Sequence, residues 1–484
     1  MKLKEIIEKI TVLESHADCE MEISGLCYDS RKAEPGFLFI AVRGFEADGH
    51  RFISKAVEKG ASAVICETAP DVDIPYILVE DSRLALALAS CAFYSYPASE
   101  MKIIGVTGTS GKTTSTNLIK HIIETELGVK VGLIGTNCNM IGETELHTEH
   151  TTPESLELQQ LFREMADAGC SYVVMEVSSH SLSLNRVAGI QFSTAVYTNL
   201  ALDHLDFHHT MEEYAAAKKL IFSMCDKACV NLDDAWSEFM LEGIKCPVIT
   251  TSANGNSGEL IAKDIRLSDS NVRFAAVYGN EVSMMRLAIP GMFSVHNALT
   301  AVSACLSEGL SLEKCAEGLS SAKGVKGRVE TVPIGKDYTV IIDYSHKPDS
   351  LENVLKTLRP VTKNRLITLF GCGGDRDRSK RPIMGAVAAE NSDFVIVTSD
   401  NPRTEEPQAI IDEILTGMTD CRTPYEVICD RIEAIHWAID NATPGDVILL
   451  AGKGHEDYQI IGHEKHHMDE REIVLDYLKE KEAL

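Results

Sequence analysis

Residues 105–114 read Gly-Val-Thr-Gly-Thr-Ser-Gly-Lys-Thr-Thr, where an apolar run at 102–106 gives way to a helix-like segment from Thr113. This order predicts a strand, a glycine-rich turn and a helix. Backbone N–H groups of such a turn and the N-terminus of the helix can bind phosphate oxygens, while Lys112 adds a positive charge and Thr113 a hydroxyl for Mg²⁺. We therefore predict a nucleotide phosphate site, with ATP as the energy source, formed by Gly108, Thr109, Ser110, Gly111, Lys112, Thr113 and Thr114.

The spacing of the glycines departs from the usual phosphate-binding pattern. That pattern has a glycine five residues before Gly111, whereas this chain has Val106 there, with Gly105 and Gly108 on either side. On this stretch alone, a glycine-rich turn without a ligand therefore stays open as the alternative.

Length and charge narrow the class of protein. A chain of 484 residues exceeds what one hydrophobic core usually supports, so we expect two or three domains. The net charge of −26 disfavours nucleic acid and anionic membranes as partners and favours a small-molecule substrate. Residues 1–8 mix charged and apolar side chains, so we expect no signal peptide, no membrane span and a cytoplasmic protein. The 14 cysteines are scattered singly, which predicts reduced, mostly buried thiols.

Apolar runs separated by turn residues predict three α/β domains, at 1–97, 98–325 and 326–484. In the second and third domains, strands alternate with helices, which predicts parallel sheets covered on both faces. In the third, polar or glycine-rich loops follow the strands expected at 338–343, 366–370, 394–398 and 447–450. Ligands of such sheets bind at these carboxyl ends.

Glu176 is at the end of the strand predicted at 172–177, and His204 follows the strand predicted at 194–198. A carboxylate and an imidazole near a phosphate site suit a hard cation that also contacts phosphate, so we predict both as metal ligands. Each residue alone is also compatible with an ordinary polar loop. Lys218 lies beside Lys219 in a helix-like segment, and its spacing does not distinguish it from a solvated helix face.

The loop Asp400-Asn401-Pro402-Arg403 follows a predicted strand of the third domain. Its guanidinium can pair with a carboxylate and its acidic group with an ammonium, which together suit an amino-acid zwitterion. An ordinary Asx turn is the alternative interpretation of this tetrapeptide.

Several motifs occur in one order along essentially the whole chain, and together they resemble the Mur ligases, the ATP-dependent amide-forming enzymes of peptidoglycan precursor synthesis. The motifs are Asp29-Ser-Arg31, residues 108–114, His150-Thr-Thr-Pro153, Glu176-Val-Ser-Ser-His180, Asn199 to His204, Tyr214 to Lys218, His296-Asn-Ala298, Gly327-Arg-Val-Glu330, Asp343-Tyr-Ser-His-Lys-Pro348, Asp400 to Arg403 and Gly452 to Glu456.

The resemblance implies a small N-terminal α/β domain that binds a UDP-sugar, a central P-loop ATPase-type domain with a parallel sheet, and a C-terminal Rossmann-like domain that binds an amino acid. It also implies the reaction, in which meso-2,6-diaminopimelate is added to UDP-N-acetylmuramoyl-L-alanyl-D-glutamate through an acyl phosphate. Within the family, Asp-Asn-Pro-Arg marks the diaminopimelate-adding enzymes. Lysine lacks the distal carboxylate of diaminopimelate and would leave Arg403 unpaired, which is costly.

Three alternatives stay open. An L-lysine-adding enzyme of the same family is disfavoured by Arg403, and a folylpolyglutamate-type or cyanophycin-type ligase is disfavoured by residues 29–31. A non-catalytic nucleotide-binding regulator with the same fold is disfavoured by the intact set Lys112, Thr113, Glu176 and His204.

The resemblance also implies roles for individual residues. The UDP-sugar substrate would contact Ser30, Thr151, Thr152, Ser178 and Arg186. The adenosine of ATP would contact Asn297, Arg328, Asp343 and His346. Diaminopimelate would contact Arg376, Asp400, Asn401, Pro402, Arg403, Gly452 and Glu456. Lys112, Glu176, His204 and Lys218 would be catalytic, with Mg²⁺ held by Thr113, Glu176, His204 and a carbamylated Lys218. We expect a monomer, and a solvated loop at 463–467.

Overall fold

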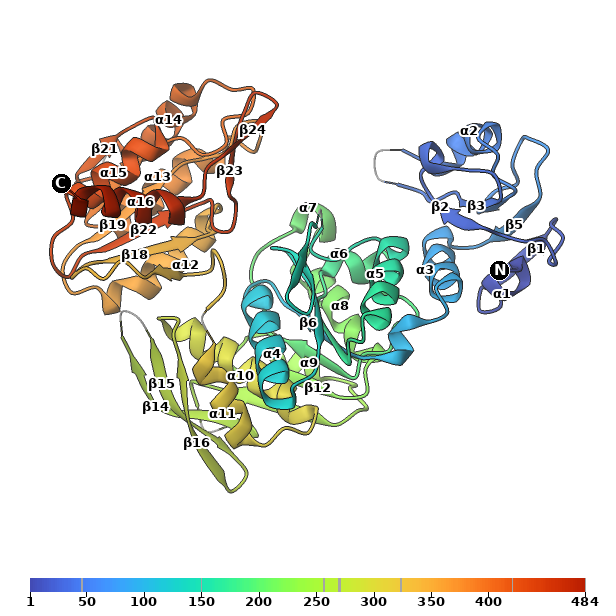
Figure 1. Ribbon diagram of the computed structural model, residues 1–484, viewed down its shortest axis with the longest axis horizontal. Helices are drawn as coiled ribbons and strands as arrows, with labels where there is room; N and C mark the ends of the chain where they lie inside the picture. The colour runs from blue at the N-terminus through green and yellow to red at the C-terminus, as the bar shows by residue number, and fades with distance from the viewer. Residues whose placement is uncertain are drawn as a thin grey trace. The chain divides into compact units, whose positions relative to one another are not determined.

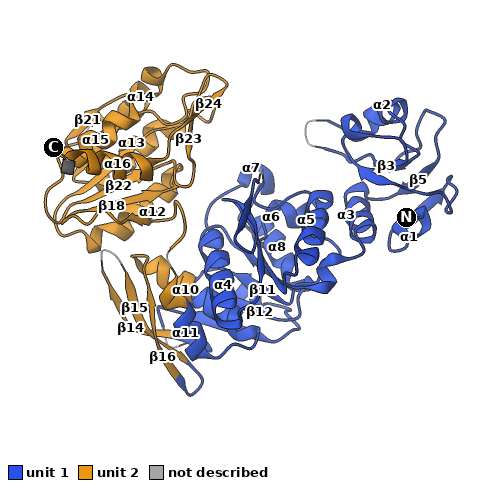
Figure 2. Cartoon of the chain, viewed as in Figure 1, with its two compact units in different colours: residues 1–261, 278–281, 299–318 blue, residues 262–277, 282–298, 319–484 orange. Residues whose placement is uncertain are grey.

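A computed structural model describes residues 1–44, 47–148, 150–255, 257–268, 271–322, 324–419 and 421–483. The chain divides into two units, each of helices and strands (Figure 2). Unit 1 holds residues 1–261, 278–281 and 299–318, and unit 2 holds 262–277, 282–298 and 319–484. Within the described ranges, no helix is both long enough and apolar enough to cross a membrane.

The N-terminal part of unit 1 forms a five-stranded sheet with strand order β1-β5-β4-β3-β2 (Figure 1). β2 to β5 are parallel, and β1 runs antiparallel to β5. Apolar side chains from the strands are buried in two clusters. The elements are β1 (Val12–Ser15), β2 (Gly25–Cys27), β3 (Phe37–Ile40), β4 (Ala63–Cys66), β5 (Tyr76–Val79), α1 (Leu3–Ile6), α2 (Ile53–Glu58) and α3 (Ser82–Phe93), with 3-10 turns η1 (Ser30–Lys32), η2 (Gly49–Phe52) and η3 (Pro97–Glu100).

The larger sheet of unit 1 contains the strand that precedes the glycine-rich turn. Its order within the unit is β13-β12-β11-β6-β10-β7-β8-β9. The pairs are parallel except where β8 and β9 form antiparallel pairs. The strands are β6 (Lys102–Thr107), β7 (Val131–Ile134), β8 (Asn139–Ile141), β9 (Thr144–Leu146), β10 (Tyr172–Glu176), β11 (Thr194–Tyr197), β12 (Ala228–Asn231) and β13 (Val248–Ser252). The helices are α4 (Lys112–Leu127), α5 (Ser155–Asp167), α6 (Ser179–Ser183), α7 (Leu205–His208), α8 (Met211–Lys219), η4 (Leu220–Met224), α9 (Ser237–Leu241) and most of α11 (Leu312–Ser321).

β6 lies between β10 and β11, and all its residues after Lys102 are buried. α4 packs on β6, β7 and β10 and ends at Gly128, whose φ of +64° is the left-handed conformation typical of a helix end. The carboxyl ends of these parallel strands meet at one edge of the sheet. The glycine-rich turn therefore lies beside Glu176, the last residue of β10, and Thr198, which follows β11.

Unit 2 contains a six-stranded sheet with order β17-β18-β22-β19-β20-β21, parallel except at β17. Its strands are β17 (Glu330–Val332), β18 (Thr339–Asp343), β19 (Leu366–Phe370), β20 (Phe394–Val397), β21 (Tyr425–Val427) and β22 (Val447–Ala451). Its helices are α12 (Pro348–Leu358), η5 (Arg359–Val361), α13 (Lys380–Asn391), α14 (Pro407–Leu415), η6 (Thr416–Met418), α15 (Arg431–Asp440) and α16 (Glu470–Ala483). Most of β14 (Leu260–Leu267), β15 (Val272–Tyr278) and β16 (Glu281–Leu287), and the start of α10 (Met292–Ser307), also belong to this unit.

Both faces of this sheet are buried, as the continuous apolar strands predict. Ile367 and Leu369 of β19 pack in one cluster with α15 and α16. The strands predicted at 338–343, 366–370, 394–398 and 447–450 are confirmed, and their polar loops leave the same edge of the sheet.

The segment 463–467 differs from the predicted solvated loop. It forms part of a hairpin of β23 (Tyr458–Ile461) and β24 (Glu464–His467). Gly462, at φ +61°, supplies the left-handed residue that a tight hairpin turn needs. All four side chains of β24 are exposed, so the prediction of exposure is confirmed and the prediction of a loop is wrong.

Candidate active site

The glycine-rich turn is shaped by close contact with the chain that follows β11. Gly108 has φ +149°, and a Cβ atom built on it would lie 1.8 Å from Thr198 Oγ1, so only glycine fits. The side-chain amide of Asn199 binds both backbone groups of Ser110, accepting its N–H at 2.9 Å and donating to its carbonyl at 3.2 Å. Thr109 N donates to Asn199 O at 2.9 Å. The turn is thus held before any ligand binds.

Two lysines meet the carbonyl of Gly108. Lys112 Nζ donates to it at 2.9 Å and to the Thr109 carbonyl at 3.0 Å, and Lys218 Nζ donates to it at 2.8 Å. Lys218 is 1% exposed, so it does not belong to a solvated helix face. Burial, with the charge of Lys112 as a smaller cause, holds the pKa of the Lys218 ammonium well below its usual range. Burial therefore shifts the balance at this position from the ammonium toward the neutral amine.

Glu176 is buried at the end of β10, and both of its carboxylate oxygens bind Thr136. Thr136 donates its N–H at 2.9 Å and its hydroxyl at 3.1 Å. The Thr136 hydroxyl also lies 3.0 Å from Thr151 Oγ1, and Thr152 Oγ1 donates to the Glu176 carbonyl at 2.9 Å. Ser178 N in turn donates to Thr152 Oγ1 at 3.1 Å. The structure therefore brings three of the predicted substrate residues together with the predicted metal ligand.

Arg186, which is also predicted to contact the UDP-sugar substrate, forms a hydrogen bond and an ion pair. Its guanidinium donates to the Thr152 carbonyl at 3.1 Å and pairs with Glu154 at 2.6 Å. Glu154 also lines a pocket of about 510 Å³ in unit 1 whose wall includes Ser30, the residue predicted to contact uridine. Tyr28, Arg31, Lys55 and Arg83 line the same pocket. Three cationic side chains thus face this space together with two carboxylates, those of Asp29 and Glu154, and its volume is in the range of small-molecule sites.

His204 immediately precedes α7 and has a left-handed backbone, φ +54°, and its Nε2 lies 3.3 Å from Asp203 Oδ2. Its ring lies 4.8 Å, centroid to centroid, from His180. Nearby, His208 is buried against Tyr214, with ring centroids 5.0 Å apart, and its Nε2 lies 2.8 Å from Ser179 Oγ. Burial lowers the pKa of His208 to about 4.

The predicted metal ligands alone do not make a preformed cage. Among the described residues, no group of three or more His, Cys, Asp or Glu side chains is placed to hold a metal ion. Glu176 instead ends β10, the strand beside β6, Thr113 lies in the first turn of α4, and His204 precedes α7. Phosphate oxygens would complete a coordination shell rich in oxygen around a cation held by these residues. The residues present therefore fit Mg²⁺ bound together with a nucleotide.

In unit 2, Arg328, Asp343 and His346 meet at the end of β18. The Asp343 carboxylate accepts Val329 N at 2.8 Å and Ser345 N at 2.9 Å, and burial raises its pKa. The Arg328 guanidinium lies 5.1 Å from the centre of the Tyr344 ring, and His346 Nδ1 lies 2.9 Å from the Tyr344 carbonyl. Asn297, the fourth residue of this predicted group, is 7% exposed on α10.

The loop after β20 and the loop after β22 form one polar cluster. Asn401 Nδ2 donates to Glu456 at 2.9 Å. Lys453, which is completely buried, donates to Asn401 Oδ1 at 2.7 Å and pairs with Glu456 at 3.2 Å and Asp400 at 3.4 Å. Gly452 has φ +112°, and a Cβ atom there would lie 3.2 Å from Asp400 Oδ2. The pocket residues predicted on these two loops are therefore in direct contact.

Arg403 is the residue predicted to bind the distal carboxylate. Its Nη1 donates to the Gly374 carbonyl at 2.9 Å, and its own backbone is left-handed, with φ +52°. That backbone is held by the hairpin: Arg403 N donates to Ile460 O at 3.1 Å, and Gly462 N donates to Arg403 O at 2.7 Å. Arg376 lies on the loop after β19, is exposed, and donates to the Asp375 carbonyl at 3.1 Å.

Sequence reasoning missed Thr136, Asn199 and Lys453, as well as the hairpin. Asn199 lies in the motif from Asn199 to His204, and Lys453 lies in the motif from Gly452 to Glu456. Their place in these motifs could have marked both as candidate site residues. Thr136 and Ile460 act through backbone groups or contacts distant in the sequence, for which one sequence offers no signal.

The architecture and these clusters identify the class of protein. Residues 22–94 match the model of the Mur ligase family, catalytic domain, residues 106–305 match the Mur ligase middle domain, and residues 327–454 match the Mur ligase, glutamate ligase domain. The chain belongs to the Mur ligase family, and the prediction that it is a ligase is confirmed.

Two relatives that are similar to this chain over nearly its whole length have the same name. The chain is 45% identical to a protein of Clostridium tetani over 99% of this chain and 100% of the relative, and 49% identical to one of Caldanaerobacter subterraneus over 96% of each. Both are named UDP-N-acetylmuramoyl-L-alanyl-D-glutamate--2,6-diaminopimelate ligase. A solved structure of a ligase with that name aligns with a TM-score of 0.75 and 33% identity, covering 100% of this chain and 99% of that one.

Proposed function

We propose that this ligase uses ATP to join meso-2,6-diaminopimelate to the D-glutamyl residue of UDP-N-acetylmuramoyl-L-alanyl-D-glutamate, a step of peptidoglycan precursor synthesis. The observation that carries this proposal is the polar cluster in unit 2 in which the carboxylates of Asp400 and Glu456 both pair with buried Lys453. The loop that holds Asp400 also carries the guanidinium of Arg403, which donates to the Gly374 carbonyl. Such a set complements an amino acid that bears ammonium groups and a distal carboxylate. The names of the relatives support the same substrate pair.

The phosphate end of ATP binds the turn at 108–114. Backbone N–H groups and Lys112 neutralise charge while the free carboxylate of the D-glutamyl residue attacks the γ-phosphorus. The bond from the β,γ-bridging oxygen to the γ-phosphorus breaks, which releases ADP and leaves an acyl phosphate. An amine of diaminopimelate then attacks the acyl carbon, and loss of phosphate and a proton gives the amide.

Mg²⁺ would be held by Thr113, Glu176 and His204 together with Lys218 as a carbamate, and it would supply charge stabilisation at the phosphates. Lys218 is prepared for this modification because burial favours its neutral amine. The neutral amine nitrogen would bond to the carbon of CO₂ and lose a proton, so that a neutral group becomes an anion.

The remaining groups supply binding. Ser30 and the pocket around it would hold the uridine end, and Thr151, Thr152, Ser178 and Arg186 would hold the muramoyl-dipeptide. Asn297, Arg328, Asp343 and His346 would contact adenosine, and Arg376, Asp400, Asn401, Pro402, Arg403, Gly452 and Glu456 would form the amino-acid pocket. This division of labour corresponds to three domains at 1–97, 98–325 and 326–484. Cytoplasmic location and a monomeric state stay predictions.

Phosphate release tests the proposal. Purified protein is mixed with ATP, Mg²⁺ and UDP-N-acetylmuramoyl-L-alanyl-D-glutamate, and either meso-diaminopimelate or L-lysine is added. We expect release that depends on diaminopimelate, with little for lysine. Release with lysine instead would retain the ligase and contradict the substrate. No release with either would contradict the proposed reaction.

A further inference from the structure

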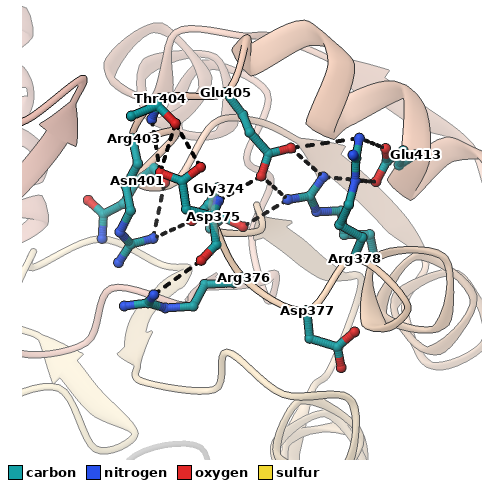
Figure 3. A network of polar contacts seen from close by, with 12 residues as sticks. Gly374, Asp375, Arg376, Asp377, Arg378, Asn401, Arg403, Thr404, Glu405 and Glu413 are labelled. Carbon is teal, nitrogen blue, oxygen red and sulfur yellow. Dashed lines mark hydrogen bonds and ion pairs between the residues drawn. The ribbon is translucent and has the colours of Figure 1, made fainter. Parts of the chain in front are cut away.

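Two loops carry the two guanidinium groups proposed for diaminopimelate. We call residues 371–377 the Arg376 loop and residues 399–405 the Arg403 loop. Figure 3 shows that polar contacts join them along much of their length. Gly374 N donates to Asn401 O at 2.9 Å, and a Cβ atom on Gly374 would lie 1.9 Å from Pro402 O. The backbones are therefore in direct contact.

Thr404 and Asp375 form a second connection. Thr404 donates its N–H to the Asp375 carboxylate at 3.2 Å and its hydroxyl at 2.8 Å. Asp375 holds a left-handed backbone, φ +53°, which is uncommon for a residue with a side chain. Its own N–H donates to Glu405 at 2.6 Å. Arg376 is the next residue along the chain, so its direction depends on how Asp375 is held.

Arg381 of α13 forms the third connection. Its side chain is completely buried and pairs with both oxygens of Glu405, at 2.7 and 3.0 Å. The same guanidinium donates to the Gly373 carbonyl at 3.3 Å and pairs with Glu413 of α14 at 2.8 Å. Arg381, with the backbone N–H of Asp375 as a smaller cause, lowers the pKa of Glu405 to about 2. Glu405 is thus an anion of the Arg403 loop that binds the backbone of the Arg376 loop.

We propose that Thr404 and Glu405 are positioning residues that fix the spacing between the Arg376 and Arg403 guanidinium groups, and thereby the selection of an amino acid with a distal carboxylate. This inference rests on the proposed function. A guanidinium recognises a carboxylate through a rigid fork, so a small shift of either loop weakens the pairing.

A positioning role of Thr404 and Glu405 can be tested separately from an effect on the stability of the fold. Thr404 and Asp375 are exposed, and exposed polar contacts add little to the stability of a fold. Loss of the Thr404 hydroxyl should therefore leave the unit folded while the Asp375 carboxylate loses one of its partners. Glu413 provides the matched control for Glu405, because both carboxylates pair with Arg381 and only Glu405 contacts the Arg376 loop.

The test compares Thr404→Val, Thr404→Ser, Glu405→Gln and Glu413→Gln with the wild-type protein in the phosphate-release assay, with circular dichroism to check folding. For Thr404→Val and Glu405→Gln we expect the KM for diaminopimelate to rise about tenfold, the size of one lost hydrogen bond to a charged group. The KM for ATP should not change. Thr404→Ser and Glu413→Gln should retain the wild-type KM.

Unchanged KM values in Thr404→Val and Glu405→Gln would overturn the positioning proposal while the proposed function stands. An equal rise in Glu413→Gln would also overturn it, because the effect would then be one of general stability. A wild-type protein that uses lysine and not diaminopimelate would instead contradict the proposed function, and the positioning proposal would fall with it.

Discussion

The glycine-rich turn that we propose binds phosphate and the loops that we propose bind the amino acid, called the pocket below, are built in different ways. The turn is one continuous stretch, 108–114, whose shape comes from glycines and from backbone groups bound by Asn199. The pocket combines loops that follow three strands, β19, β20 and β22, held by charged side chains such as Lys453 and Arg381. A site of the first kind can be recognised in a short motif, whereas a site of the second kind depends on contacts between distant residues.

The largest expected effect is on the turn. Lys112→Met should lower phosphate release roughly a thousandfold, because removal of a charge aimed at a developing oxyanion costs about that much. Steady-state kinetics measure it. Lys120→Met, on the same helix and paired with Glu124, is the matched control and should retain its rate. Similar losses in both variants would mean that the helix, not the phosphate contact, is damaged.

Lys218→Met should lower turnover at least about a hundredfold by removing the carbamate charge near the phosphates. Its neighbour Lys219, whose side chain is 25% exposed and pairs with Glu242, is the control, and Lys219→Met should remain active. Carbon NMR after exposure to isotopically labelled bicarbonate should show a carbamate signal in wild-type protein and none in Lys218→Met. Near-normal turnover of Lys218→Met would contradict the carbamate role.

A change at Arg403 should alter the preference of the enzyme for diaminopimelate over L-lysine. Arg403→Met should lower kcat/KM for diaminopimelate about tenfold to a hundredfold, since one charge-assisted pairing is lost, and should leave the rate with L-lysine unchanged. Competition between the two amino acids measures the ratio. Arg359→Met removes a guanidinium that is 41% exposed and pairs with Asp393, outside this network, so it should not alter that ratio. An unchanged ratio in Arg403→Met would remove the basis for the proposed selectivity.

The smallest expected effect is that of His208 on how the stability of the protein changes with pH. Burial lowers the pKa of His208 to about 4 from the ordinary value of 6.5, so between these values the unfolded chain binds a proton that the folded chain does not. Stability contributed by the neutral ring is therefore lost as pH falls from 6.5 to about 4. His208→Asn should reduce this acid-dependent fall in melting temperature by roughly 2–4 °C. Exposed His209→Asn should leave the slope unchanged, and an unchanged slope in both would show that His208 does not cause it.

Buried strands could be located from the sequence, whereas side-chain burial on a helix and the exposed hairpin could not. Apolar runs located β6, β10, β18, β19 and β22 to within a few residues, because strands buried on both faces are continuously apolar. Spacing alone left Lys218 indistinguishable from Lys219, since helix periodicity does not say which neighbour is buried by the rest of the fold. The exposed β24 has no apolar pattern of its own, so its pairing with β23 and the contact of β23 with Arg403 were not predictable.

The hairpin has a consequence for how the chain matures during synthesis. Proteins are made from the N-terminus, and their parts fold as they emerge. Asn199 and Lys218, which hold the glycine-rich turn, have both been made before half of the chain exists. Asn401 and Arg403 accept hydrogen bonds from the backbone N–H groups of Ile460 and Gly462, each 59 residues further along the chain. A nascent chain that ends before this hairpin would therefore carry the glycine-rich turn with Asn199 and Lys218 in place, whereas Asn401 and Arg403 would lack these hydrogen bonds.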